Sequence, residues 1–149
     1  MAQIDSETDF MLFEAGERVL DVSKQKKMLQ EVDTNPDLHL LVAEDEGLLL
    51  GYLGMTRLKQ RRVKHIAKLV CGVANQASGR GIGKSLLQAA IQRAQDSGVT
   101  RIELTVAATN HKAKKLYEKL GFELEGYRKQ SLRIENTLQD ECYMALLLT

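Results

Sequence analysis

The spacing of apolar residues changes near residue 38, from a helical period to the extended period of strands. Ahead of that point, four apolar residues can share one face of a helix over residues 23–32: Val22, Met28, Leu29 and Val32. Asp21 or Ser23 can cap the start of this helix, and Asn35-Pro36 ends it. We therefore predict one helix ahead of the first clear strand.

Residues 38–44 and 48–58 are aliphatic runs separated by Asp45-Glu46-Gly47. This linker supplies a glycine for the positive φ of a tight turn, so we predict an antiparallel hairpin. A third run, residues 63–74, is apolar at nearly every position. Such a run is typical of a strand that is buried on both faces, and this one leads into a glycine-rich turn.

A helix follows the glycine-rich turn at residues 78–83. Its apolar positions have the spacing of an amphipathic helix: Leu86, Leu87, Ala90, Ile91 and Ala94. Asp96-Ser97-Gly98 ends this helix. Residues 99–107 then alternate apolar and polar as a strand does, and a right-handed crossover makes this strand parallel to residues 63–74.

The last third of the chain predicts one more helix and two strands. Asn110 or Thr109 can cap the helix, and Gly121 ends it. Four residues share its buried face: Ala113, Leu116, Tyr117 and Leu120. We expect the two strands near residues 122–134 and 141–148.

The size and charge of the chain limit its fold and partners. Its 149 residues, 44% of them apolar, are enough for one domain over residues 1–149. The element order predicts an α/β fold with a mixed, mostly antiparallel sheet and a parallel pair in its middle. Lys and Arg number 21 against 20 Asp and Glu, so we expect neither nucleic acid nor a membrane as a partner.

Local features favour a cytoplasmic protein without a metal. The basic cluster at residues 59–64 lies between two strand-like runs, where a solvated hairpin tip is favoured over an anion or RNA patch. The N-terminus lacks a signal segment, and no stretch reaches the ~20 apolar residues of a membrane span. Cys71 and Cys142 lie in apolar runs without metal-ligand spacing, so we interpret both as buried thiols.

Glycines recur at every second position of Ser78-Gly79-Arg80-Gly81-Ile82-Gly83. Before a helix, such a backbone can point several N–H groups into one space, and the helix N-terminus adds positive charge that favours anions. The P-loop motif fails because it needs glycine at Ser78. The dinucleotide fingerprint fails because it needs glycine at Lys84 or Leu86. A plain packing turn is the alternative to a phosphate site.

Two segments resemble the GNAT superfamily of N-acetyltransferases. Its Gln/Arg-x-x-Gly-x-Gly/Ala signature matches the turn at both glycines, with Ser78 in place of Gln or Arg. Its Asn-x-x-Ala-x-x-Leu-Tyr-x-x-x-Gly-Phe segment is similar to residues 110–122 at every named position. Residues 140–147 also look like the last strand of bacterial members, so the resemblance covers roughly residues 38–148.

The resemblance implies a three-layer fold with helices on both faces of the sheet, and acetyl-CoA as co-substrate. It implies that main-chain N–H groups of the turn hold the phosphates and that the main chains of Cys71 and Val73 pair with the pantetheine arm. The expected cofactor-binding residues are Cys71, Val73, Gly79, Arg80, Gly81, Ile82, Gly83, Lys84, Ser85 and Asn110. It also implies that Tyr117 is the acid that protonates the leaving thiolate.

Several of these residues can instead have a purely structural role. Tyr117 can be ordinary helix packing, and Asn110 can be only an N-cap. Arg80 and Lys84 can screen the phosphates or be solvated at a helix start. An alternative to the enzyme is an acyl-CoA-binding or regulatory module with little catalytic activity.

The base for the acceptor amine is not determined by the sequence. A lysine-like amine with a pKa of about 10.4 is neutral about one time in 10³ at neutral pH, so a base raises the reactive fraction. Glu103 is the leading candidate for the base because it shares a strand face with Thr105. A Glu beside Arg101 more often forms a surface ion pair with it. Glu141 and His65 are weaker candidates.

The family's usual first strand has no clear counterpart ahead of Phe10-Met11-Leu12-Phe13. Either residues 3–6 form an edge strand, or the chain is truncated, or a second chain covers the exposed edge, and we favour a homodimer. The same N-terminal region usually forms part of the wall that selects the acceptor. The sequence therefore does not decide between a small-molecule amine and an amine of a protein or peptide as the acceptor.

Overall fold

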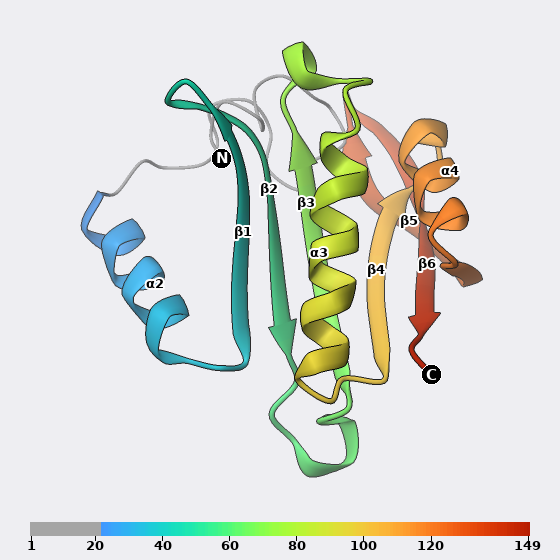
Figure 1. Cartoon of the computed structure of the whole chain (residues 1–149). Helices are drawn as coiled ribbons and strands as arrows, with labels where there is room; N and C mark the ends of the chain where they lie inside the picture. The colour runs from blue at the N-terminus through green and yellow to red at the C-terminus, as the bar shows by residue number, and fades with distance from the viewer. Residues whose placement is uncertain (1–21) are drawn as a thin grey trace.

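The structure is a computed structural model that describes residues 22–149 (Figure 1). Its longer elements are α2 (Val22–Thr34), β1 (Leu38–Asp45), β2 (Leu48–Arg57), β3 (Ile66–Val73), α3 (Ile82–Asp96), β4 (Arg101–Ala107), α4 (His111–Lys119), β5 (Glu123–Ile134) and β6 (Thr137–Leu147). Two short 3-10 helices, η1 (Arg61–Val63) and η2 (Asn75–Ala77), flank β3. The edge strand expected at residues 3–6 and the anchor at residues 10–13 lie outside the described residues.

The described strands form one sheet in the order β1-β2-β3-β4-β6-β5. β3 and β4 are parallel, and every other neighbouring pair in this sheet is antiparallel. The connection between the parallel strands runs through α3. The predicted α/β fold, with a parallel pair in the middle of a mostly antiparallel sheet, is therefore confirmed.

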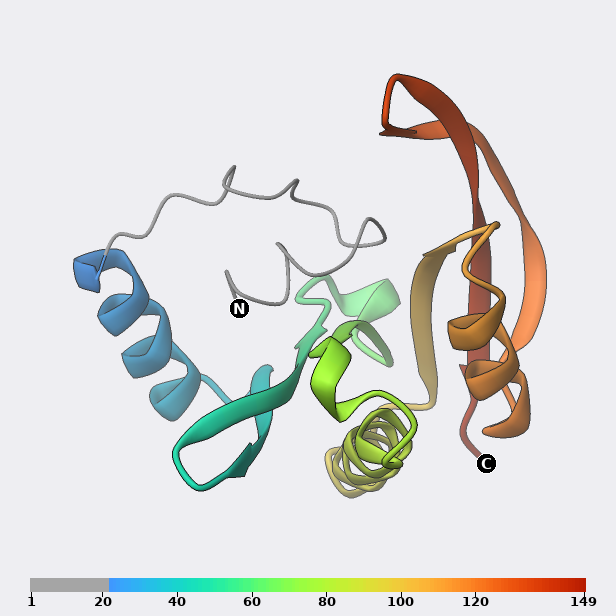
Figure 2. The same ribbon diagram turned by 90° about the horizontal axis from the view of Figure 1, so that it is seen from above.

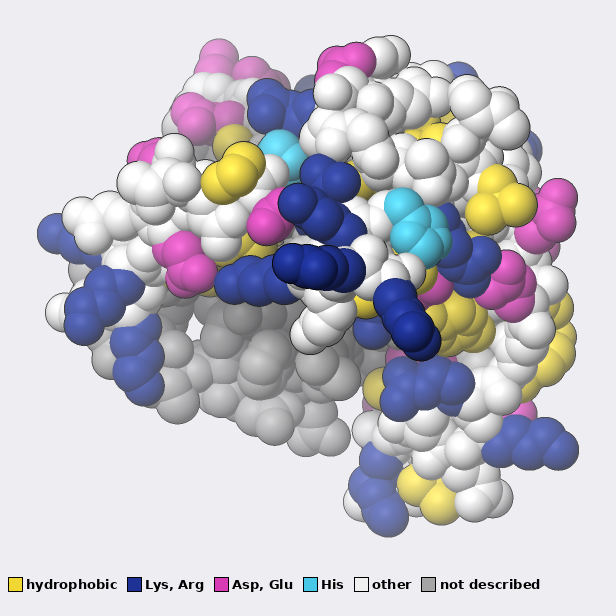
Figure 3. Space-filling view, turned by 90° about the horizontal axis from the view of Figure 1, so that it is seen from below, with side chains coloured by type: hydrophobic (Ala, Val, Ile, Leu, Met, Phe, Trp, Pro, Cys, Tyr) yellow, Lys and Arg dark blue, Asp and Glu magenta, His cyan; other side chains and the backbone are white. Residues whose placement is uncertain are grey.

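The basic cluster at residues 59–64 forms the loop between β2 and β3. Its η1 turn means that β3 begins at Ile66 rather than at residue 63. Four basic side chains of the loop are exposed: Lys59, Arg61, Arg62 and Lys64. Figure 3 shows Lys and Arg side chains gathered at this end of the molecule. The loop has the exposure that a solvated hairpin tip requires.

The last hairpin is longer than the sequence pattern predicts. β6 begins at Thr137 rather than at residue 141. Glu135 and Asn136 connect it to β5, with positive φ values of 46° and 62°. Two successive positive φ values are typical of a two-residue hairpin turn. Such turns usually contain glycine, and neither residue here is one, so the sequence does not reveal the turn.

α3 and α4 pack against the same face of the sheet. Their buried residues belong to one apolar cluster with residues of β2, β3, β4 and β6. The largest fully buried side chains are Leu53, Met55, Leu87, Ile102, Met144 and Cys142. α2 lies on the other side of the β1–β2 hairpin from α3 (Figure 2). Helices therefore flank both faces of the sheet, as the resemblance implies.

The two cysteines differ in burial. Cys142 is fully buried, as predicted, whereas Cys71 is only partly buried because it lies where β3 leaves β4. Within residues 22–149, no group of His, Cys, Asp and Glu side chains is placed to hold a metal ion. None of the helices in that range has the length and apolar character to span a bilayer.

Candidate active site

β3 and β4 separate soon after they begin. They pair only between residues 66–68 and residues 101–103. β3 nevertheless continues beside β2 to Val73, and β4 continues beside β6 to Ala107. The sheet therefore opens between its two middle strands, toward the end that carries the glycine-rich turn.

The main chains of Cys71 and Val73 face this opening. The Ala74 N–H donates to the Leu50 carbonyl at 2.8 Å, so Ala74 and every second residue before it face β2. Main-chain groups alternate sides along a strand, which turns those of Cys71 and Val73 toward β4. Both residues line the opening, and their contact with a pantetheine arm stays a prediction.

The glycine-rich turn leads directly into α3. Gly79 and Gly81 have positive φ values of 81° and 78°, a conformation that favours glycine. No side chain caps α3, and its first turn has no acidic residue. The Ser85 N–H donates to the Gly81 carbonyl at 3.0 Å. Three N–H groups ahead of this bond have no acceptor within the helix: those of Ile82, Gly83 and Lys84. Free N–H groups at a helix N-terminus can bind an anion, and phosphate binding by this turn stays a prediction.

Gly83 also allows close packing. A Cβ on this residue would lie 3.2 Å from Leu116 Cδ2 and 3.5 Å from Val73 Cγ2. Leu116 belongs to α4, so the glycine lets α3 approach α4 and β3 together. The packing explanation of the turn thus applies to Gly83, and the phosphate explanation stays a prediction.

Ser78 and Lys112 connect the turn to α4. The Lys112 ammonium donates to the Ser78 hydroxyl across 34 positions of sequence. A cation thus lies at the position where the GNAT signature has Gln or Arg. Lys112 occupies an unspecified position of the second motif, so sequence reasoning missed it.

The remaining predicted residues of this region have local partners or are exposed. The Asn110 side chain accepts from the Ala113 N–H at 3.2 Å and so caps α4. Arg80 and Asp45 form a 3.7 Å ion pair, with 53% and 60% of their side chains exposed, which makes the pair weak. Lys84 and Ser85 are exposed in the first turn of α3.

Tyr117 lies on the buried face of α4, 8% exposed. Its ring packs edge-on against Phe122, with centroids 5.7 Å apart. Burial, and then the neighbouring Cys71, raise the pKa of Tyr117. Burial also raises the pKa of Cys71 to about 12. Both groups keep their protons at neutral pH, so the phenol can donate a proton but is no base.

A pocket of ≈ 360 Å³ opens where β3 and β4 part. Ile102 and Leu104 point into the core beneath α3 and α4, so the alternate residues of β4 point to the opposite face. Six side chains line the pocket from four strands: Lys68, Val70, Glu103, Thr105, Arg128 and Tyr143. Among the sequence candidates for the base, Glu103 is the one that lies in this pocket.

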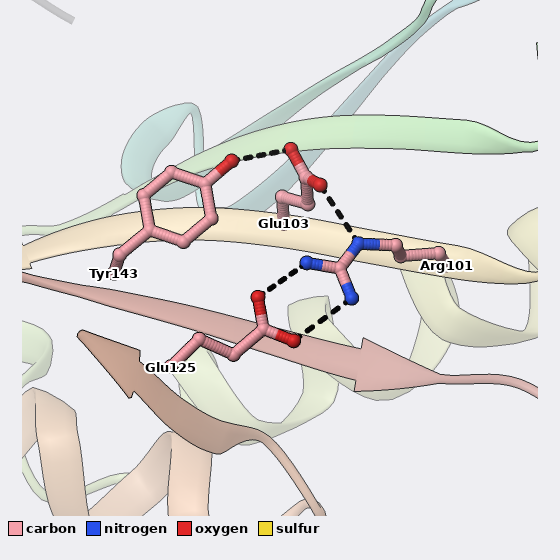
Figure 4. A network of polar contacts seen from close by, with 4 residues as sticks. All are labelled: Arg101, Glu103, Glu125 and Tyr143. Atoms are coloured by element: carbon pink, nitrogen blue, oxygen red, sulfur yellow. Dashed lines mark hydrogen bonds and ion pairs between the residues drawn. The ribbon is translucent and has the colours of Figure 1, made fainter. Parts of the chain in front are cut away.

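Glu103 belongs to a network of four side chains (Figure 4). It accepts from Arg101 Nε at 2.7 Å and from the Tyr143 hydroxyl at 2.6 Å. Arg101 also donates to both oxygens of Glu125, at 2.9 and 2.5 Å. The expected pair of Glu103 with Arg101 therefore exists, but Glu103 is only 8% exposed.

The network keeps Glu103 ionised. Burial alone raises the pKa of Glu103, but hydrogen bonds from Tyr143 and Arg101 and nearby positive charges outweigh it and hold the pKa below its usual range. The bond to Glu103, together with burial, raises the pKa of Tyr143. The pocket thus presents a carboxylate beside a protonated phenol.

The other candidate bases are less suited. Glu141 is 8% exposed and pairs with Arg128 at 3.2 Å. His65 is exposed and precedes β3, away from the end where the strands part.

The sequence model of the Acetyltransferase (GNAT) family matches residues 5–122. The chain belongs to the GNAT family. This match confirms the resemblance of the two motifs. A solved structure of a GNAT family acetyltransferase from Streptococcus pneumoniae aligns with a TM-score of 0.92 and 28% identity, over 99% of this GNAT chain and 88% of that one.

Two curated relatives have named activities. The L-amino acid N-acetyltransferase AaaT of Escherichia coli is 33% identical over 111 residues, 74% of this GNAT chain and 68% of that protein. The mycothiol acetyltransferase of Paenarthrobacter aurescens is 41% identical over 91 residues, 59% of this chain. The alignment spans only 28% of the length of the mycothiol enzyme.

Replacing Tyr143 with Phe is expected to raise the pKa of Glu103, because the carboxylate loses a hydrogen bond that favours its charged form. A lowered folded-state pKa stabilises the fold above the unfolded pKa, and this stabilisation is lost as the pH falls through the folded value. As the pH falls, the variant should therefore lose this stabilisation at a higher pH than the wild type.

The measurement is an NMR titration of the Glu side-chain carboxyl carbons. The control is Tyr127→Phe, since Tyr127 is 55% exposed on β5 and lies outside the network. An unchanged Glu103 titration in the Tyr143 variant would show that the hydrogen bond does not set this pKa.

Proposed function

We propose that this chain transfers acetyl from acetyl-CoA directly to a primary amine. The observation that carries the proposal is the opening between β3 and β4, which ends at the glycine-rich turn. The protonated Tyr117 lies on the face of the sheet that the helices cover, and the pocket that contains the Glu103 carboxylate lies on the opposite face. Membership of the GNAT family and the named acetyltransferases among the relatives support it.

The residues of the opening fit the parts of acetyl-CoA. The phosphates would meet the Lys112 ammonium and the N–H groups at the start of α3 that have no acceptor within the helix. The pantetheine arm would extend the sheet by pairing with Cys71 and Val73, because their main-chain groups face the opening. Asn110, the N-cap residue of α4, is proposed to bond to the same arm.

The chemistry needs stabilisation of a thioester oxyanion and a proton for sulfur. A main-chain N–H of β3 in the opening can donate to the developing oxyanion, where the low-dielectric surroundings strengthen the bond. The amine forms a C–N bond, the C–S bond breaks, and the departing thiolate takes the Tyr117 proton. The amine's own proton leaves to water, and Tyr117 regains a proton from solvent.

Glu103 is proposed to hold the amine rather than to store its proton. A carboxylate with a lowered pKa is a weak base toward an ammonium with a pKa of about 10.4. It attracts the cation and orients it toward the opening, and the neutral fraction reacts from that position.

The direct test is thiol release from acetyl-CoA across a panel of amino acids, polyamines, aminoglycosides and peptides. We expect release with at least one class, and calorimetric binding of acetyl-CoA in preference to ATP. Acetyl-CoA binding without thiol release for any amine would support the acyl-CoA-binding module instead. Preferential ATP binding would contradict both.

Tyr117→Phe is expected to lower kcat by about 10²-fold or more, because the thiolate loses its proton donor. The KM for acetyl-CoA should change little, since the phenyl ring still packs on Phe122. Steady-state kinetics with an accepted amine provides the measurement, with Tyr127→Phe as the matched control. Unchanged turnover in the Tyr117 variant would rule out the acid role.

Lys112→Ala is expected to raise the KM for acetyl-CoA by about 10-fold, because a charged contact to phosphate is lost. Turnover of S-acetyl-N-acetylcysteamine, which has the thioester but no phosphate, should be unaffected. Lys119→Ala, at the other end of α4, is the control. Equal losses with both thioesters would mean that Lys112 acts through the fold instead.

A further inference from the structure

The charges around the pocket do not cancel locally. Arg101 is shared between the carboxylates of Glu103 and Glu125, so these three side chains carry one excess negative charge (Figure 4). That excess lies at the pocket through Glu103, whose second oxygen accepts from Tyr143. A cationic group in the pocket would meet an ionised carboxylate.

Lys68 supplies an excess positive charge at the same position along the strands. It is the register partner of Glu103 in the parallel pair, and both side chains line the pocket. Its charge helps to lower the pKa of Glu103, yet the two form no ion pair within 4.0 Å in the part of the chain that the structure describes. The pocket therefore holds a carboxylate whose arginine is shared with a second carboxylate, beside a lysine that has no ion pair among the described residues.

The second cation at the pocket is already paired. Arg128 of β5 lies 3.2 Å from the Glu141 carboxylate. The Arg128 guanidinium therefore adds no net charge, and Lys68 is left as the pocket's cationic partner for an anionic group.

The pocket also reaches the proposed site of reaction. Leu69 and Leu104 border it, and their side chains are buried in the core between the sheet and the helices. The pocket floor is thus the opening between β3 and β4. Val70, 58% exposed, adds an apolar wall beside Lys68. A small amine has room for a side chain there.

We infer that the acceptor is a small zwitterionic amine, an α-amino acid with a free carboxylate. Its ammonium lies against Glu103 and Tyr143, and its carboxylate lies against Lys68. A peptide N-terminus has the ammonium without the neighbouring carboxylate, and a polyamine would bring a further positive charge to Lys68. The inference rests on the proposed acetyl transfer and names the substrate class of that same site.

The test compares matched acceptors that differ only in the carboxylate. L-leucine, L-leucinamide and 3-methylbutylamine share one side chain, and the same series is run for methionine, serine, glutamate and lysine. For each accepted side chain, kcat/KM for the free acid should exceed that for the amide by about 10-fold or more, the effect of one charge-assisted contact.

Lys68→Gln should remove this preference. It should lower kcat/KM for the free acid by about 10-fold and that for the amide by much less, because the charge faces the carboxylate and Arg101 and Tyr143 still keep Glu103 ionised. Lys64→Gln, in the exposed β2–β3 loop, is the matched control. If Lys68 has only a structural role, the variant would lower kcat/KM equally for the free acid and the amide, which would overturn the inference.

Other outcomes separate the two proposals. Turnover of amides or peptides as fast as free amino acids would overturn the zwitterion inference and leave acetyl transfer standing. Thiol release with none of these acceptors and with none of the wider amine panel, despite acetyl-CoA binding, would instead overturn the proposed function.

Discussion

The sheet divides between β3 and β4 because each strand stays with its outer neighbour. β3 follows β2 to Val73 and β4 follows β6 to Ala107, whereas the two strands pair with each other at three residue pairs. Parallel pairing is slightly weaker per residue than antiparallel pairing, so the sheet opens at its weakest junction. The glycine-rich turn lies at the end of this division, α3 and α4 cover one face of it, and the pocket opens on the other.

The two faces of the division hold their ionisable groups in opposite states. On the helix face, burial keeps Tyr117 protonated, as an acid for a leaving thiolate requires. On the pocket face, Arg101 and Tyr143 keep Glu103 ionised despite its burial, as attraction of an ammonium requires. The sheet separates these surroundings, and an acyl group bound in its opening, as proposed, would meet both.

The local parts of this arrangement could be predicted from the sequence. Periodicity with the right-handed crossover predicted the parallel pair, and the glycine-rich turn stood out by composition. An ion pair of Glu103 with Arg101 was the sequence's alternative to a base, and the structure contains that pair. The parts that were not predicted depend on distant contacts. Tyr143 lies 40 positions from Glu103, and Lys112 lies 34 positions from Ser78. Strand register and helix packing create these contacts, and no local pattern encodes them.

We propose above all that the opening between β3 and β4 receives the thioester arm of acetyl-CoA. Hydrogen exchange of the main-chain amides, measured by NMR with and without saturating acetyl-CoA, tests it most directly. We expect the amides of Cys71 and Val73 to become protected on binding, because they gain hydrogen-bond acceptors. Binding of acetyl-CoA that leaves exchange at both amides unchanged would contradict it.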